Sequence, residues 1–222
     1  MKNLLLVALA AFLPVSAASA VVVQAPQSGG PWLGYMNVFE LPSNGGGFVF
    51  GSPWGTPDLN SSFNDAAPSL TMSPNTIGDP HPFWYIGGGG PGAAGNKIME
   101  ANLYIEVGDI YSGQTVTFTG NVLSNTLTQA HSAVIFIRDF APDYSSSNDI
   151  FIPAPPGAFS VSLNTIAGAG RHVQYGFQMR GVNVWATDVA PYGNVVIGTI
   201  PAPASAGLLA LGGLVATRRR RA

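Results

Sequence analysis

The middle of the chain is built from short runs in which apolar and polar residues alternate. Positions 116, 118 and 122 are valine or phenylalanine, with threonine or asparagine beside them. Residues 99–106, 159–163 and 172–180 alternate in the same way, whereas residues 133–137 are continuously apolar. A period of two predicts a β-strand with one buried face, and an unbroken apolar run predicts a strand covered on both faces.

Further strands are predicted at residues 32–39, 48–50, 69–72, 83–86, 182–188 and 195–199. Turn-forming Gly, Pro, Asn and Ser residues separate these runs, and no amphipathic segment of helical length lies between residues 21 and 200. About ten short strands with such spacing predict an all-β fold, an antiparallel β-sandwich of the jelly-roll type, for residues 21–199. A domain of this size needs no disulfides, and the chain contains no cysteine.

Charged residues make up only 9% of the chain and are unevenly distributed. All eleven acidic residues lie between Glu40 and Asp188, whereas five of the nine basic residues lie in the two ends. Residues 21–200 therefore carry four basic and eleven acidic groups, a net charge of −7. Because an acidic surface repels phosphate backbones, this balance argues against a nucleic-acid partner.

The first twenty residues have the three parts of a secretory signal peptide. Lys2 precedes an apolar run over residues 4–15, and Ala18 and Ala20 fit the small-residue cleavage site. We therefore expect signal peptidase to remove residues 1–20 and the protein to be exported, with Val21 as its new N-terminus.

The last residues, 200–222, form a second targeting segment. The apolar stretch over residues 204–217 is shorter than the roughly 20 residues of a full membrane span. Four consecutive arginines follow it, and basic clusters of this kind remain cytoplasmic. This predicts a short hydrophobic helix in the inner membrane, a cytoplasmic C-terminus and an exported middle domain.

This tail resembles the PEP-CTERM protein-sorting domain of bacterial envelope proteins, which combines a short proline motif, an apolar helix and a terminal arginine cluster. The corresponding residues are Pro201, Ala202 and Pro203, then Arg218, Arg219, Arg220 and Arg221. Ala202 stands where the family motif has glutamate. The resemblance implies processing by an exosortase, a membrane transpeptidase, and association with exopolysaccharide at the cell envelope. The alternative is a plain C-terminal membrane anchor.

The sequence contains no recognisable catalytic motif: G-x-S-x-G, H-E-x-x-H and the P-loop pattern do not occur. Glu100 and Glu106 share one face of a predicted strand, but six residues separate them by about 20 Å. A glycosidase pair needs about 5 to 9.5 Å, so the two cannot be partners. Either could still pair with a carboxylate on a neighbouring strand.

Polar side chains suited to a sugar gather on one predicted strand. His172, Gln174, Gln178 and Arg180 share one face of residues 172–180, opposite an apolar face. On a concave sheet they could line a polysaccharide groove, or a catalytic groove in which Tyr and His serve as base and acid. An ordinary solvent-exposed sheet face is the alternative.

Aromatic residues give a second candidate surface. Trp185 lies beside Asn183 and Thr187, and Trp84 and Tyr85 belong to a run of three consecutive aromatics. Flat aromatic faces beside hydrogen-bonding groups suit sugar rings. Alternatively, these residues fill the core.

Asp139, Asp143 and Asp149, with Ser and Asn between them, are candidate oxygen ligands for a structural Ca²⁺, although a hydrated loop is the alternative. Three hypotheses therefore remain. The first is a non-catalytic envelope or matrix protein that binds polysaccharide. The second is a secreted lyase or glycosidase, and the third is a purely structural surface protein.

Overall fold

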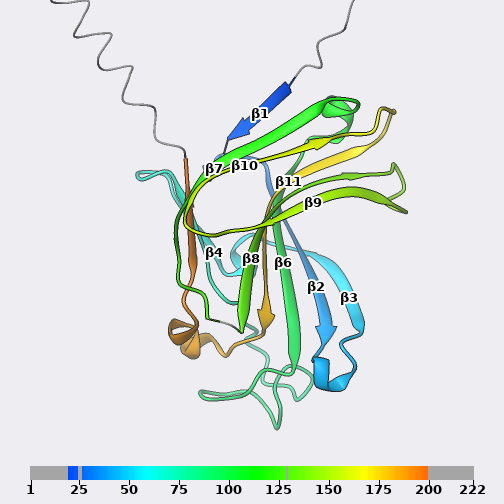
Figure 1. Ribbon diagram of the computed structural model, residues 1–222. Helices are drawn as coiled ribbons and strands as arrows, with labels where there is room; N and C mark the ends of the chain where they lie inside the picture. The colour runs from blue at the N-terminus through cyan, green and yellow to red at the C-terminus, as the bar shows by residue number, and fades with distance from the viewer. Residues whose placement is uncertain (1–19, 25–26, 129, 200–222) are drawn as a thin grey trace, which may run out of the picture.

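The protein is a β-sandwich of two six-stranded sheets, described by a computed structural model over residues 20–24, 27–128 and 130–199 (Figure 1). Two predicted segments lie outside the described residues. They are the signal peptide up to residue 19, which includes the predicted cleavage-site residue Ala18, and the sorting tail over residues 200–222. That tail includes Pro201, Ala202, Pro203 and Arg218 to Arg221. The predicted all-β sandwich is confirmed, and the chain passes repeatedly between its two sheets.

Sheet A is organised around its longest strand, β7. Its members are β1 (Ala20–Gln24), β4 (Ser61–Asn64), β5 (Ser69–Met72), β7 (Thr115–Asn125), β10 (Gly157–Asn164) and β12 (Val195–Gly198). β10 lies along one edge of β7, and β1 and β12 lie in succession along the other, followed by β5 and β4. β1 pairs with β7 in the parallel sense, which the expectation of a purely antiparallel sandwich did not include.

Sheet B is antiparallel throughout, in the order β3-β2-β6-β11-β8-β9. Its members are β2 (Trp32–Glu40), β3 (Phe48–Trp54), β6 (Lys97–Glu106), β8 (His131–Phe140), β9 (Ser147–Pro153) and β11 (His172–Val182). Figure 1 shows the β2–β3 hairpin beside β6 at one margin of this sheet. The registers place Asn102 opposite Tyr35 and Gln178, and Glu106 opposite Gln174, so residues from several strands share one outward face.

The core lies between the two sheets and is formed by the alternating apolar residues. Phe118 of β7 and Phe177 of β11 are both buried, with ring centroids 5.3 Å apart across the sandwich. Met36, Met99 and Ile135 of sheet B are fully buried as well. Burying a side chain of this size contributes about 1.5–3 kcal/mol, so the inward faces provide most of the stability.

Two predicted strands are wrong. Residues 83–86 form a turn, in which Trp84 and Tyr85 donate backbone hydrogen bonds to the carbonyl of His81, between two prolines and a glycine-rich loop. Residues 182–188 leave the sheet after Val182. The Asn183 amide oxygen accepts from the Lys97 backbone, and its amide nitrogen donates to Trp84, so a side chain replaces the strand pairing.

Helical structure in the described residues is limited to single 3₁₀ turns. They are η1 (Pro42–Asn44), η2 (Pro57–Leu59), η3 (Gly108–Tyr111), η4 (Ala186–Asp188) and η5 (Ala190–Tyr192). None of the helices in these ranges is long and apolar enough to cross a bilayer.

Candidate ligand-binding site

A groove of about 540 Å³ crosses the outward face of sheet B. It runs over β3, β2, β6, β11 and β8, and the turn between β8 and β9 borders it. Its lining residues are Tyr35, Asn37, Pro53, Asn102, Tyr104, Arg138, Phe140, Tyr144 and Gln174. The combination of aromatic rings and amide groups provides both flat apolar surface and hydrogen-bonding groups.

Two glycines leave space for the aromatic rings on this face. A Cβ at Gly51 would lie 2.9 Å from the ring of Tyr35 and 2.7 Å from the side-chain oxygen of Asn37. A Cβ at Gly176 would lie 2.2 Å from the carbonyl oxygen of Leu103 and 2.9 Å from the Cβ of Tyr104. A side chain at Gly176 would meet backbone atoms, and one at Gly51 would displace the side chains of Tyr35 and Asn37, so both glycines preserve the arrangement of this face.

Asn102 holds the floor of the groove together. This residue is only 1% exposed, and its oxygen accepts from Arg138 at 3.1 Å and from Gln178 at 2.9 Å. Its amide nitrogen donates to the backbone oxygens of Tyr35 and Glu100. With both ends of its amide engaged, Asn102 links β2, β6, β8 and β11 and fixes the side chains above it.

Arg138 supplies a positive charge to the groove. Its guanidinium lies 4.5 Å from the ring centre of Phe136 and 4.9 Å from that of Phe151. Burial lowers the pKa of Arg138, while the negative charges of Asp149 and Glu100 act in the opposite direction. An arginine remains protonated under such conditions, so the groove holds a partly desolvated cation.

Glu106 is the centre of a hydrogen-bonded cluster at one end of the groove. It accepts from Gln174 at 2.6 Å, and His172 Nδ1 and the Tyr144 hydroxyl lie 3.0 and 3.3 Å from it. The rings of Tyr144 and His172 stack with centroids 4.1 Å apart. These contacts attach the turn between β8 and β9 to β6 and β11 and define that end of the groove.

Tyr104, one of the three tyrosines that line the groove, retains its proton at neutral pH. Burial raises the pKa of Tyr104 to about 12, and the negative charge of Glu106 acts in the same direction. At neutral pH the phenol is therefore a hydrogen-bond donor and not a base. Its ring and hydroxyl together suit the apolar face and the hydroxyl groups of a sugar.

The four polar residues predicted on one strand face do share the outward face of β11, but only Gln174 lines the groove. His172 acts through Glu106 and Tyr144, and Gln178 lies beneath the surface, bonded to Asn102. Arg180 lies farther along the strand and pairs with Glu100 at 3.3 Å.

The second predicted aromatic surface lies elsewhere. Tyr85 is fully buried, and its hydroxyl bonds to the carbonyl oxygens of Ile77 and Val184. Trp185 packs edge-on against Tyr85, beyond the last residue of β11, and Trp84 is partly buried against the core. This cluster fixes the loop that follows β5 and contributes nothing to the groove.

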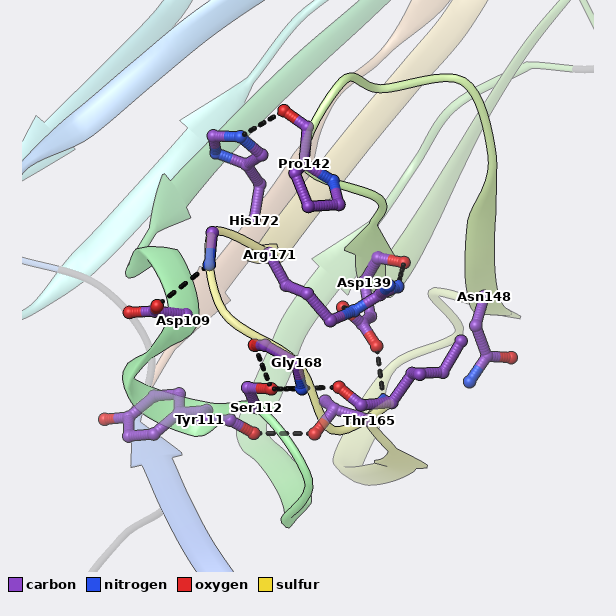
Figure 2. Close-up of polar contacts among 12 residues, drawn as sticks. Asp109, Tyr111, Ser112, Asp139, Pro142, Asn148, Thr165, Gly168, Arg171 and His172 are labelled. Atoms are coloured by element: carbon purple, nitrogen blue, oxygen red, sulfur yellow. Dashed lines mark hydrogen bonds and ion pairs between the residues drawn. The ribbon is translucent and has the colours of Figure 1, made fainter.

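The predicted calcium ligands do not converge. Asp139 points into the sandwich, where one carboxylate oxygen accepts from Arg171 Nε at 2.6 Å and the other from the backbone of Ile166 (Figure 2). Asp143 bonds to Ser145 in an exposed turn. Asp149 pairs across the strands with Arg138, the residue next to Asp139. Because successive side chains of a strand point to opposite faces, Asp149 lies on the opposite face of the sheet from Asp139. The described residues contain no cluster of three such ligands.

Glu100 and Glu106 both lie on the outward face of β6, as predicted. Glu100 contacts Asn37 and Arg180, and Glu106 contacts the cluster described above, so both carboxylates have polar partners within the sheet.

Sequence reasoning missed most of the lining residues. The alternation over residues 99–106 places Asn102 and Tyr104 on the same strand face as Glu100 and Glu106. Tyr35, Pro53 and Arg138 join them only through strand order and register. The signal available in advance was the even spacing of Tyr104 with Asn102 and Glu106. Comparison with known protein families, characterised proteins and solved structures found no match to this chain.

Proposed function

We propose that this protein is a non-catalytic, exported component of the cell envelope or extracellular matrix that binds a polysaccharide in the groove on sheet B. The groove carries the proposal, because it combines tyrosine faces, amide groups and a rigid floor. Grooves of this composition present both stacking surfaces and directed hydrogen bonds. A purely structural surface protein would not require such a feature.

The chemistry of the groove favours binding over catalysis. His172 has both ring nitrogens near acceptors, Glu106 at 3.0 Å and the carbonyl of Pro142 at 3.3 Å, and is therefore committed to holding the turn. The raised pKa of Tyr104 disfavours the tyrosinate that a lyase would use as its base. A polysaccharide lyase remains the competing proposal, and formation of unsaturated products during incubation with polysaccharides would support it.

The binding proposal is tested with the full-length chain on a panel of immobilised polysaccharides. We expect Tyr35→Ala and Tyr104→Ala each to weaken binding about tenfold, the effect of losing roughly 1.4 kcal/mol of contact energy. Phe48→Ala is the matched control, because this exposed aromatic at the start of β3 does not line the groove. Absence of binding to every polysaccharide by the folded protein would refute the proposal.

We further propose that the N-terminal and C-terminal segments target the protein to the cell envelope. Signal peptidase would cut after Ala20, the inner membrane would hold the C-terminal segment, and an exosortase would cut near Pro201, Ala202 and Pro203. The test is mass spectrometry of the C-terminus in hosts with and without an exosortase. A tail that remains intact in both hosts would indicate a plain membrane anchor.

A further inference from the structure

The basic residues of the described domain differ in one respect. Lys97, Arg171 and Arg180 each form an ion pair, with Glu40 at 3.0 Å, Asp139 at 2.6 Å and Glu100 at 3.3 Å, respectively. Arg138 is the fourth, and no carboxylate of the described residues lies within 4.0 Å of its side-chain nitrogens. Every Asp and Glu of the chain belongs to that described part, eleven in all. Arg138 is therefore the one Lys or Arg of the described residues without an ion-pair partner, although these residues hold eleven acidic groups against four basic ones.

Most N–H donors of the Arg138 guanidinium have no hydrogen-bond acceptor among the described residues. The group has five N–H donors, and within the described domain one of its nitrogens bonds to a side chain, that of Asn102. The rings of Phe136 and Phe151 offset part of the cost of its burial. An arginine that is desolvated, held by a buried amide and open to a groove is preorganised for an anion.

The acids nearest to Arg138 are engaged with other partners. Asp149, its cross-strand neighbour, accepts from Ser147 at 3.0 Å. Glu100 is held by Asn37 and Arg180, and Glu106 by the cluster at the end of the groove. Each of these carboxylates thus has another partner and lies beyond 4.0 Å from the Arg138 nitrogens, so Asp149 and Glu100 act on Arg138 only at longer range and its nearest position remains open to a group from outside.

We propose that Arg138 binds the carboxylate of an acidic sugar, so that the ligand of the groove is a uronic-acid polysaccharide. This inference rests on the proposed polysaccharide binding and specifies its ligand class. The carboxylate pairs with the free edge of the guanidinium, in the planar geometry that arginine favours. The sugar ring lies against Tyr104 or Tyr35, and Gln174 and Asn37 bond to its hydroxyls.

The charges around the groove favour a carboxylate over a phosphate. Only one unpaired cation faces the groove, while Glu100 and Glu106 lie on the same sheet face. A single guanidinium balances a monoanion, whereas a phosphate monoester carries up to two negative charges at neutral pH. A sulfate ester is also a monoanion, but it lacks the planar shape, so the experiment must compare the two groups directly.

The test measures binding of the full-length chain to oligouronates of mannuronate, guluronate, glucuronate and galacturonate. Each is compared with its methyl-esterified form, and a sulfated galactose oligomer is measured in parallel. We expect binding of at least one oligouronate, and at least tenfold weaker binding of its methyl ester. Arg138→Gln should weaken binding by about tenfold or more, because a charge-assisted bond is lost. Arg138→Lys should give an intermediate loss, since the positive charge remains but the two parallel N–H donors of the guanidinium are lost.

Arg180→Gln is the matched control, because it removes a cation of the same sheet face that lies outside the groove lining and is already paired with Glu100. It should leave oligouronate binding within about twofold of the original. Thermal unfolding of Arg138→Gln keeps the test interpretable. Removing a cation with no counter-ion should not lower the unfolding temperature by more than a few degrees.

The outcomes separate this inference from the proposed function. Equal binding of the oligouronates and their methyl esters, unaffected by Arg138→Gln, would overturn the carboxylate assignment and leave polysaccharide binding intact. Preference for the sulfated oligomer would overturn it as well. Failure of the folded chain to bind any sugar, neutral or acidic, would refute both proposals together.

Discussion

Asp139 and Arg171 form a buried ion pair that closes one end of the sandwich. The Asp139 side chain is 0% exposed and that of Arg171 is 10% exposed, and Arg171 also donates to the backbone oxygen of Asp139 at 2.9 Å. The second carboxylate oxygen holds the backbone of Ile166 at 2.6 Å. Figure 2 shows how this pair joins β8 to the loop between β10 and β11.

Breaking this pair should destabilise the domain strongly. We expect Arg171→Met to lower the free energy of unfolding by about 3–5 kcal/mol, because it leaves a buried carboxylate without its cation. Urea denaturation of the full-length chain measures this loss. Arg180→Met, at a half-exposed pair, should cost about 1 kcal/mol or less. Similar losses in the two variants would contradict the assigned structural role of Arg171.

Gly176 should tolerate no side chain. An added Cβ would lie 2.2 Å from the oxygen of Leu103 and 2.7 Å from the Cα of Tyr104, so β11 would have to separate from β6. We expect Gly176→Ala to cost about 1–3 kcal/mol of stability and to weaken any sugar binding. Gly90→Ala, where nothing lies within 4 Å of the added atom, serves as the control and should unfold at nearly the original temperature.

His131 should make stability depend on pH. Burial lowers its pKa from the ordinary 6.5, and its Nε2 lies 2.9 Å from the carbonyl of Val182, so Nε2 carries the proton. Its Nδ1 is buried without a hydrogen-bond partner in the described residues, and a proton added there would find no acceptor. The folded state therefore binds fewer protons than the unfolded chain as the pH falls below 6.5.

The expected result is a free energy of unfolding that is highest above neutral pH and declines between about pH 7 and the lowered pKa of His131. Each unit of the pKa shift contributes about 1.4 kcal/mol. Chemical denaturation at several pH values should show a smaller decline for His131→Asn than for the original chain. His81→Asn, at an exposed imidazole, is the control, and an equal decline in all three proteins would contradict the prediction.

The Tyr85 hydroxyl should matter for stability and not for binding. It lies 2.6 Å from the oxygen of Ile77 and 3.1 Å from that of Val184 in a buried position. Tyr85→Phe leaves these groups unsatisfied, and we expect a loss of about 1–3 kcal/mol. Tyr144→Phe removes a hydroxyl from a half-exposed residue and should cost less than about 0.5 kcal/mol. Reduced sugar binding by a folded Tyr85→Phe protein would show that its cluster contributes to the site.

Local alternation was sufficient to predict much of the sandwich. The polar and apolar faces of β11 and β6 follow directly from residues such as Gln178 and Phe177. The failures have non-local causes. Asn183 ends β11 through side-chain bonds to Lys97 and Trp84, which are distant in sequence. The groove depends on which strands are neighbours. The periodicity of a sequence shows which face of a strand is buried but not which strand lies beside it.

The acidic residues illustrate the same limit. Asp139, Asp143 and Asp149 look like one loop in the sequence, but a strand period of two sends Asp139 inward and Asp149 outward. The residue type alone could not separate a buried ion pair from an exposed ligand. The role of Arg138 could not be predicted from the sequence either. Arg138 differs from the other basic residues in having no ion-pair partner among the described residues, and this depends on the three-dimensional arrangement.

The parallel pairing of β1 with β7 has a consequence for the order in which the domain folds. Val21 pairs with Val116 of β7, and β2 to β6 lie between these two segments in the chain. Non-local pairings of this kind close slowly, because a long intervening chain must be ordered first. Sheet B can assemble its β2–β3 hairpin early, whereas the amino end of sheet A is completed late. The first strand of the described chain is thus among the last to be paired.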